Sequence, residues 1–323
     1  MLTIIYPETI NWFYKHQAEL VAREFTHHGL AANSYSSDDI EGLSRRNGTL
    51  VVLSMWECIT DADRSGCGAG LRAILSNFER RVLLNYDSLF TPYFRRHFTF
   101  GVDLVTEIID VCLIRQTKLK TIYGRPYHWM PETFCVEEIA RIEPWSAGRP
   151  LPWAMLGHAN PARAALTAAC IETLHPGGLL FMPPIRPYDA ASALAREAIH
   201  RVLRQSDLYI WGSHHDYPYH EGLRALHAVA AGAIPCKIDP VHHSEMAQIP
   251  WIYPSLVAVH EARERRGLAK LYDEARTFLL SNATMGQHLI RALGLVAPAA
   301  LPARPSASVS NPAPLIRSKV ESR

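Results

Sequence analysis

The side chains best suited to chemistry gather between positions 207 and 239 of the 323-residue chain. An apolar run, 207–212, leads there into a polar loop that contains His214 and His215. Histidine titrates near neutral pH and is the residue that most often serves as a general base. We therefore expect His215 to accept a proton in a reaction, with His214 beside it against a bound ligand.

A carboxylate in the first half of the chain is the alternative base. Asp87 follows the apolar run 81–86, which we interpret as a buried strand. Ligands of parallel sheets bind outside the carboxyl ends of the strands, so Asp87 is expected to face a bound ligand. The sequence leaves the choice between His215 and Asp87 open.

A predicted helix at 222–231 supplies an anion site at its start. The amides of the first residues, Gly222 and Leu223, have no partner within the helix. The helix dipole favours an anion there, such as a diphosphate. Arg224 lies in the first turn, where a basic residue opposes the dipole, so we favour an ion pair with phosphate. Glu221 either caps the helix, binds a hydroxyl group of a ligand or acts as a base.

The histidines also raise the possibility of a metal site. Ligands from two neighbouring loops would then be close in space, namely His214, His215, Asp216, His220 and Glu221 together with His242 and His243. No standard zinc spacing is present, so we expect no metal. A metal-dependent hydrolase is the least favoured function.

The elements that position these residues fall into two βα series. In the first, strands are expected at 2–6, 31–35, 50–55, 81–86, 110–114 and 125–131, and helices at 12–28, 70–77 and 92–100. In the second, strands are expected at 153–157, 178–182, 207–212, 234–238 and 256–259, and helices at 161–174, 190–205 and 222–231, with two more between 262 and 293. Fully apolar strands separated by helices indicate parallel sheets that are covered on both faces.

The expected fold is therefore α/β, with two Rossmann-like, doubly wound parallel-sheet domains that face a cleft. The first domain is assigned to residues 1–135, and a linker rich in turn-forming residues to 136–152. The second domain is assigned to 153–295, and the remainder, 296–323, to a disordered tail because of its Ala, Pro and Ser content.

One segment resembles a known family. The residues Gly222-Leu223-Arg224-Ala225-Leu226-His227-Ala228-Val229-Ala230-Ala231-Gly232-Ala233-Ile234-Pro235 are similar to the Gly-Leu-x-x-x-Glu-Ala-x-Ala-x-Gly-x-x-Pro element of GT-B glycosyltransferases, known as group 1. The portion from Arg224 to His227 also resembles the Arg-x-x-Glu of the spore-maturation type. In the family the glutamate holds the ribose hydroxyls of the nucleotide. Here His227 stands at that position, and an imidazole accepts only one hydroxyl proton.

The resemblance extends to the predicted opening of the second domain. The stretch from Leu156 and Gly157 to Arg163 is similar to the family's loop in which a basic residue meets the diphosphate. The resemblance thus places Gly157 and Arg163 at the donor, together with the residues from Glu221 to Arg224.

These features imply a glycosyltransferase that uses a nucleoside-diphosphate sugar and neither metal nor cofactor. The acceptor would be a small molecule, a glycan or a lipid-linked compound. The alternative is an inactive GT-B-like protein that binds a nucleotide or a partner, since the glutamate at position 227 is lost.

Composition narrows the remaining classes. The chain has 33 basic and 31 acidic residues and a net charge of +2, which gives no field that suggests nucleic acid as a partner. Its six cysteines show no metal or redox spacing, and no leader or membrane segment is apparent, so we expect a cytoplasmic protein. Dinucleotide, P-loop and serine-hydrolase motifs are absent from the sequence.

Overall fold

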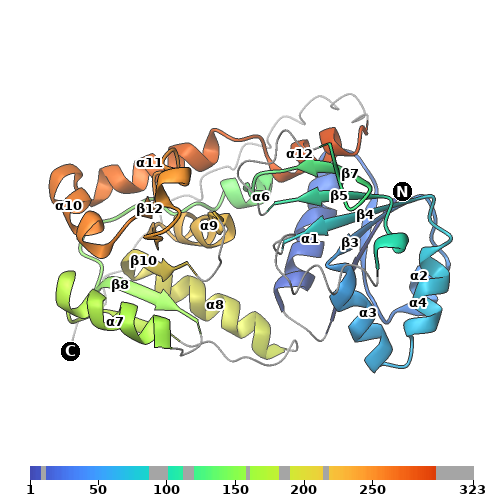
Figure 1. The fold of residues 1–323 in the computed structure, drawn as a ribbon, viewed down its shortest axis with the longest axis horizontal. Helices are drawn as coiled ribbons and strands as arrows, with labels where there is room; N and C mark the ends of the chain where they lie inside the picture. The colour runs from blue at the N-terminus through green and yellow to red at the C-terminus, as the bar shows by residue number, and fades with distance from the viewer. Residues whose placement is uncertain are drawn as a thin grey trace, which may run out of the picture.

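The structure is a computed structural model that describes residues 1–8, 12–86, 101–111, 120–157, 161–181, 190–213 and 218–295. The helix expected at 92–100 and the tail at 296–323 lie outside these residues. The described chain forms two lobes side by side, with the strands β1 to β7 in one and β8 to β12 in the other (Figure 1).

The first lobe is built on a seven-stranded sheet in the order β2-β1-β3-β4-β5-β7-β6. All its strand pairs are parallel except β6 with β7. The strands are β1 (Leu2–Tyr6), β2 (Ala32–Ser36), β3 (Thr49–Leu53), β4 (Arg80–Asn85), β5 (Glu107–Asp110), β6 (Thr121–Ile122) and β7 (Arg125–Trp129).

Alternating side chains of this sheet enter two separate cores. Val51 and Val82 pack on one face with α1 (Trp12–His27) and α12 (Met285–Ala292). Val52 and Leu83 pack on the other face with α2 (Ile40–Ser44), α3 (Met55–Arg64) and α4 (Gly68–Leu75). A short 3-10 helix, η1 (Val102–Leu104), precedes β5. Because both faces are covered, the middle residues of the central strands are apolar.

The second lobe has a five-stranded, all-parallel sheet in the order β12-β11-β10-β8-β9. Its strands are β8 (Leu151–Leu156), β9 (Leu179–Phe181), β10 (Ser206–Gly212), β11 (Ile234–Ile238) and β12 (Ile252–Tyr253). Its helices are α7 (Pro161–Thr173), α8 (Ala190–Arg204), α9 (Gly222–Ala230), α10 (Leu256–Arg266) and α11 (Leu268–Leu280), with the 3-10 helix η3 (His243–Met246). The two parallel sheets confirm the predicted fold class.

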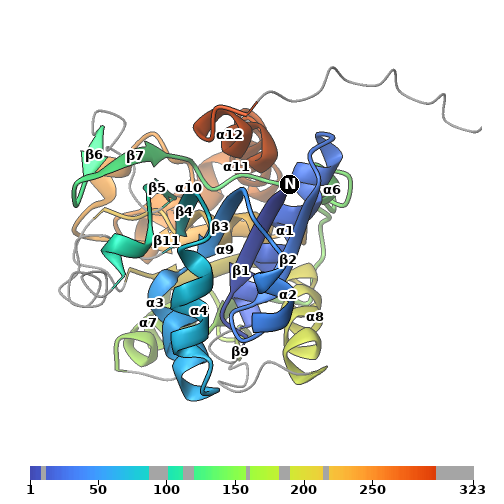
Figure 2. The ribbon, with the colours of Figure 1, turned by 90° about the vertical axis from the view of Figure 1, so that its right-hand side faces the viewer.

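Two segments cross between the lobes. The first is the linker with α6 (Val136–Ile139), and the second leads from α11 back to α12, which packs on α1 (Figure 1, Figure 2). The α12 side chains Met285 and Leu289, and Leu293 directly after the helix, belong to the core of the first lobe. This differs from the expected division, in which all residues from 153 to 295 belong to the second domain.

Two charged side chains fix α12 in place. The buried carboxylate of Glu24 accepts hydrogen bonds from the amides of Val136 and Gly286, at the starts of α6 and α12. Arg80 donates to the carbonyl of Leu293 at the other end of α12. Both contacts satisfy backbone groups that a helix leaves unpaired at its ends.

The structure corrects two of the expected strands. Residues 256–259 begin the helix α10, because Ser255 caps it by accepting the amide of Ala258. A strand spans Glu107–Asp110, with two charged residues buried at its ends, whereas residues 112–114 of the strand expected at 110–114 lie outside the described residues. Among the described residues, no helix is long and apolar enough to cross a bilayer.

Candidate functional site

The donor-side residues expected after β8 lie together. Gly157 follows β8 with a φ of 136°, and the guanidinium of Arg163 packs against it. A Cβ atom at position 157 would lie 2.5 Å from the Cζ of Arg163, so a larger residue would displace this side chain. The glycine therefore allows the Arg163 side chain, on α7, to pack against the backbone that follows β8.

A second guanidinium, that of Arg224, lies near the first. Arg224 donates to the hydroxyl of Tyr209 on β10 at 2.8 Å and to Oε1 of Glu221 at 3.2 Å. Burial disfavours its charge, but Tyr209 and Glu221 outweigh this effect and raise its pKa. Burial and the charge of Arg224 lower the pKa of Arg163. Two guanidiniums whose charges repel each other favour binding of a multiply charged anion.

The amides at the start of α9 already donate hydrogen bonds to a side chain of the protein itself. The amide of Leu223 donates to Oε2 of Glu132 at 2.9 Å, and the amide of Gly222 donates to the same carboxyl group. The Glu132 side chain is buried, and burial, followed by the charges of Glu221 and Asp110, raises its pKa to about 8. The diphosphate site that we expected on these amides is therefore taken by Glu132.

A buried lysine supports the loop before α9. Lys237 on β11 is 0% exposed, donates to the carbonyl of Tyr219 and to Oδ2 of Asp239 at 3.1 Å, and lies 4.0 Å from Oε2 of Glu221. The sequence analysis missed this residue. A lysine inside the apolar strand 234–238 could have indicated a buried ion pair, because buried lysines are rarely found without a charged partner.

His220, two residues before α9, lies next to Glu132. Its Nε2 lies 3.8 Å from Oε2 of Glu132, and its side chain is 7% exposed. Burial and the charge of Lys237 lower its pKa to about 4, so the imidazole is neutral at pH 7.

The strand ends of the first lobe carry a buried polar group next to this region. Asp110 is the last residue of β5 and is buried. Its carboxylate accepts hydrogen bonds from Nδ2 of Asn85 at 2.9 Å and from the hydroxyl of Tyr127 at 3.0 Å. The negative charge of Asp110 acts on Glu132, so the strand ends of the first lobe lie close to the start of α9. The sequence analysis missed both Asp110 and Glu132.

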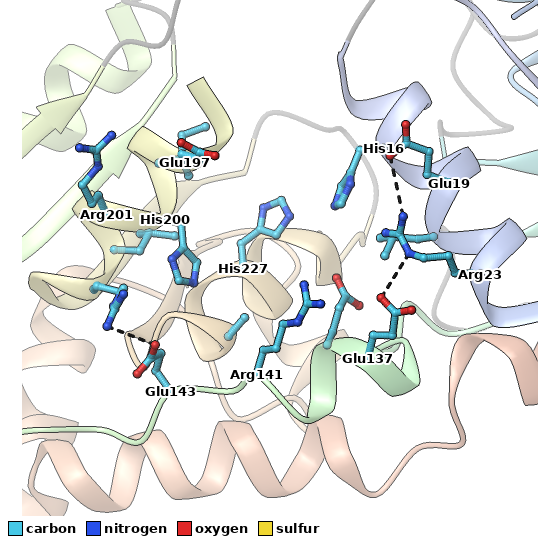
Figure 3. Close-up of a pocket in the computed structure, with 16 residues that line it drawn as sticks. His16, Glu19, Arg23, Glu137, Arg141, Glu143, Glu197, His200, Arg201 and His227 are labelled. Carbon is cyan, nitrogen blue, oxygen red and sulfur yellow. Dashed lines mark ion pairs between the residues drawn. The ribbon is translucent and has the colours of Figure 1, made fainter. Parts of the chain in front are cut away.

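His227 lines a cavity of about 1120 Å³ between the lobes (Figure 3). In Figure 3, His16 and Arg23 extend from α1, His200 from α8, and Arg141 from the linker. Ion pairs on the cavity wall join Arg23 to Glu137 at 3.3 Å and Arg204 to Glu143 at 3.2 Å. The cavity thus carries imidazole, guanidinium and carboxylate groups that suit a polar ligand.

Three of the expected site residues, Asp87, His214 and His215, lie outside the described residues. The described ranges contain no group of three or more His, Cys, Asp or Glu side chains that could hold a metal ion. Within them, His242 lies 3.5 Å from Glu245 and donates its amide to Asp239.

Comparison by sequence finds no match among known families or curated proteins. Comparison by structure finds a DNA-modifying β-glucosyltransferase, solved with and without uridine diphosphoglucose. Its TM-score is 0.53 at 10% identity, over 91% of this chain and 99% of that one. A spinosyn rhamnosyltransferase aligns with a TM-score of 0.45 at 11% identity, over 91% and 100% of the two chains, and an α1,3-fucosyltransferase with 0.39 at 10%, over 94% and 83%. The fold is consistent with that of the GT-B glycosyltransferases.

Proposed function

We propose that the protein transfers a sugar from a nucleoside-diphosphate donor to an acceptor hydroxyl, without a metal. The observation that carries this proposal is that the charges of Arg163 and Arg224 interact at the edge of the sheet where β8 and β10 lead on to α7 and α9. Ligands of parallel sheets bind at this edge. The GT-B-like fold supplies the second domain that such a reaction needs for its acceptor.

The two guanidiniums would bind the diphosphate in place of a metal. In the reaction, an acceptor oxygen forms a bond to the anomeric carbon while the bond from that carbon to the diphosphate oxygen breaks. The leaving diphosphate then gains negative charge, which the guanidiniums of Arg163 and Arg224 stabilise. The acceptor proton passes to a base, for which His215 and Asp87 remain our candidates.

The nucleoside would enter the cavity between the lobes. The volume of about 1120 Å³ is sufficient for a nucleoside. His227 lines this cavity from the second turn of α9, one turn after Arg224, so a ribose beside His227 is within reach of a diphosphate at Arg224. His227 would hold one ribose hydroxyl.

We propose a small molecule, a glycan or a lipid-linked compound as the acceptor. The structurally similar β-glucosyltransferase modifies DNA. The net charge of +2 gives this chain no field that favours nucleic acid as an acceptor.

The second candidate function is binding of a nucleotide without transfer. The bond from Leu223 to Glu132 favours it, because it removes an amide from the anion site of α9. His227 in place of the family's glutamate points in the same direction.

A donor screen tests the proposal and separates the two functions. Thermal unfolding would be followed with UDP-glucose, UDP-N-acetylglucosamine, GDP-mannose, GDP-fucose and dTDP-rhamnose, and release of nucleoside diphosphate from the best binder would then be measured. Binding together with slow hydrolysis is expected for a transferase. Binding without any release supports the second function, and no binding of any donor contradicts both.

A further inference from the structure

Glu132 forms a joint between the two domains. It follows β7, the last strand of the first sheet that is described, and precedes α6 of the linker. Its partners on α9 belong to the second domain, so the 2.9 Å bond from the amide of Leu223 crosses between domains. We call Glu132, His220, Glu221, Gly222 and Leu223 the interdomain joint.

The joint is closely packed around the Glu132 carboxyl group. A Cβ atom at position 222 would lie 2.4 Å from Oε2 of Glu132 and 2.7 Å from Nε2 of His220. Only glycine therefore allows both groups to approach the backbone of α9. Since Glu132 is 5% exposed, no solvent molecule can easily substitute for it.

The residue before α9 has a conformation that needs such support. Glu221 has a φ of 51° and a ψ of 51°, in the left-handed region that residues other than glycine rarely adopt. Such conformations persist where the surroundings fix them. Here Lys237 holds the preceding carbonyl of Tyr219, Arg224 holds the Glu221 side chain, and Glu132 holds the two amides that follow.

We propose that Glu132 is a positioning residue for donor binding: it holds the start of α9, and with it the pair of Glu221 and Arg224, in the arrangement that meets the diphosphate. This inference rests on the proposed function. Glu132 itself does not touch the donor, and it acts through Leu223 and Glu221. Because it belongs to the first domain, it also ties the donor side of the second domain to the linker.

The protonation state of Glu132 determines which substitution preserves its hydrogen bonds. With its pKa near 8, Glu132 is a neutral acid at pH 7. The groups that face it are His220 and Glu221 before α9, Asp110 of β5, and Lys237 of β11, which lies 4.0 Å from Glu221. Glutamine is therefore the matched replacement, since its carbonyl oxygen can accept both amides while its NH2 group replaces the acid proton.

Amide titration by NMR tests the positioning directly and does not depend on activity. The amide signals of Gly222 and Leu223 in the full chain would be followed between pH 4 and pH 9. We expect both to shift with a midpoint near 8, and this transition to be absent in Glu132→Gln. An unchanged transition in Glu132→Gln, or no shift of either amide in wild type, would overturn the proposal.

Kinetics with UDP-glucose, or with the best donor of the screen, test the functional part. We expect Glu132→Ala to raise the donor KM by roughly tenfold or more, as for a lost hydrogen bond to a buried group. Glu132→Gln should stay within about threefold of wild type at pH 7, because its carbonyl oxygen can still accept the amides. Glu264→Gln and Glu264→Ala, at an exposed carboxylate on α10, are the matched controls.

The two ideas fail in different ways. If wild type binds and hydrolyses no donor, the proposed function fails, and the amide titration still decides whether Glu132 holds α9. If wild type is active but Glu132→Ala has the same KM, kcat and pH profile, the function stands and the role of Glu132 is refuted.

Discussion

The carboxylate of Glu24 accepts a hydrogen bond from the amide of Gly286 at 2.8 Å, although 262 positions separate the two residues. Glu24 also accepts from the amide of Val136, so one buried side chain caps the helix starts of both segments that cross between the domains. Both crossing segments are therefore held by a side chain of α1.

Glu24→Ala should destabilise the protein by about 2–4 kcal/mol, since two buried amides lose their acceptor. Urea unfolding measures the change. Glu19→Ala, at a half-exposed position of the same helix, should change the free energy of unfolding by less than about 0.5 kcal/mol. Equal stability of the two variants would show that Glu24 does not hold the crossing segments.

Arg224→Ala should lower turnover by ~10²-fold or more, because the charge on the leaving diphosphate loses a stabilising group. Initial rates of donor hydrolysis at saturating donor provide the test. Arg265→Ala, at an exposed position of α10, is the control. Unchanged turnover in Arg224→Ala would remove this residue from the site.

Lys237→Met should destabilise the protein by about 3–5 kcal/mol, because it leaves the buried carboxylate of Asp239 without its ammonium partner. The double variant Lys237→Met with Asp239→Asn removes the stranded charge as well and should recover part of this loss. Denaturant unfolding of the single and double variants gives the comparison. If the double variant is no more stable than the single one, the ion pair is not the cause.

His220 should make the stability depend on acid pH. Its folded-state pKa of about 4 lies below the ordinary value of 6.5, so its contribution to stability is present above pH 6.5 and is lost as the pH falls toward 4. The full loss corresponds to about 3 kcal/mol. His220→Gln should not show this part of the decline, which unfolding at pH 7 and pH 4.5 measures. Parallel declines in wild type and variant would contradict the shift.

The sequence predicted the regular elements well where apolar runs were uninterrupted. The strand Leu2–Tyr6 has the expected bounds, and the helix that begins at Gly222 was placed at its correct start. The error at 256–259 arose because β-branched residues in a short apolar run favour a strand, whereas the cap at Ser255 starts a helix. Local pattern alone does not separate these two outcomes.

The site was predicted only in part. Gly157 with Arg163, and Glu221 with Arg224, were expected at one edge of the second sheet, and the structure brings them together. Glu132 was missed because its partners are about 90 positions away, in the other domain, and no local spacing indicates such a contact. Lys237 was missed although its signal is local, because it stands inside an apolar strand and pairs with Asp239 two positions later.

A crystal structure with the best-binding donor tests the central claim most directly. The account predicts diphosphate oxygens at about 3 Å from the guanidiniums of both Arg163 and Arg224, with Glu132 still bonded to Leu223. A diphosphate bound on the α9 amides with Glu132 displaced, or bound away from both arginines, would contradict it.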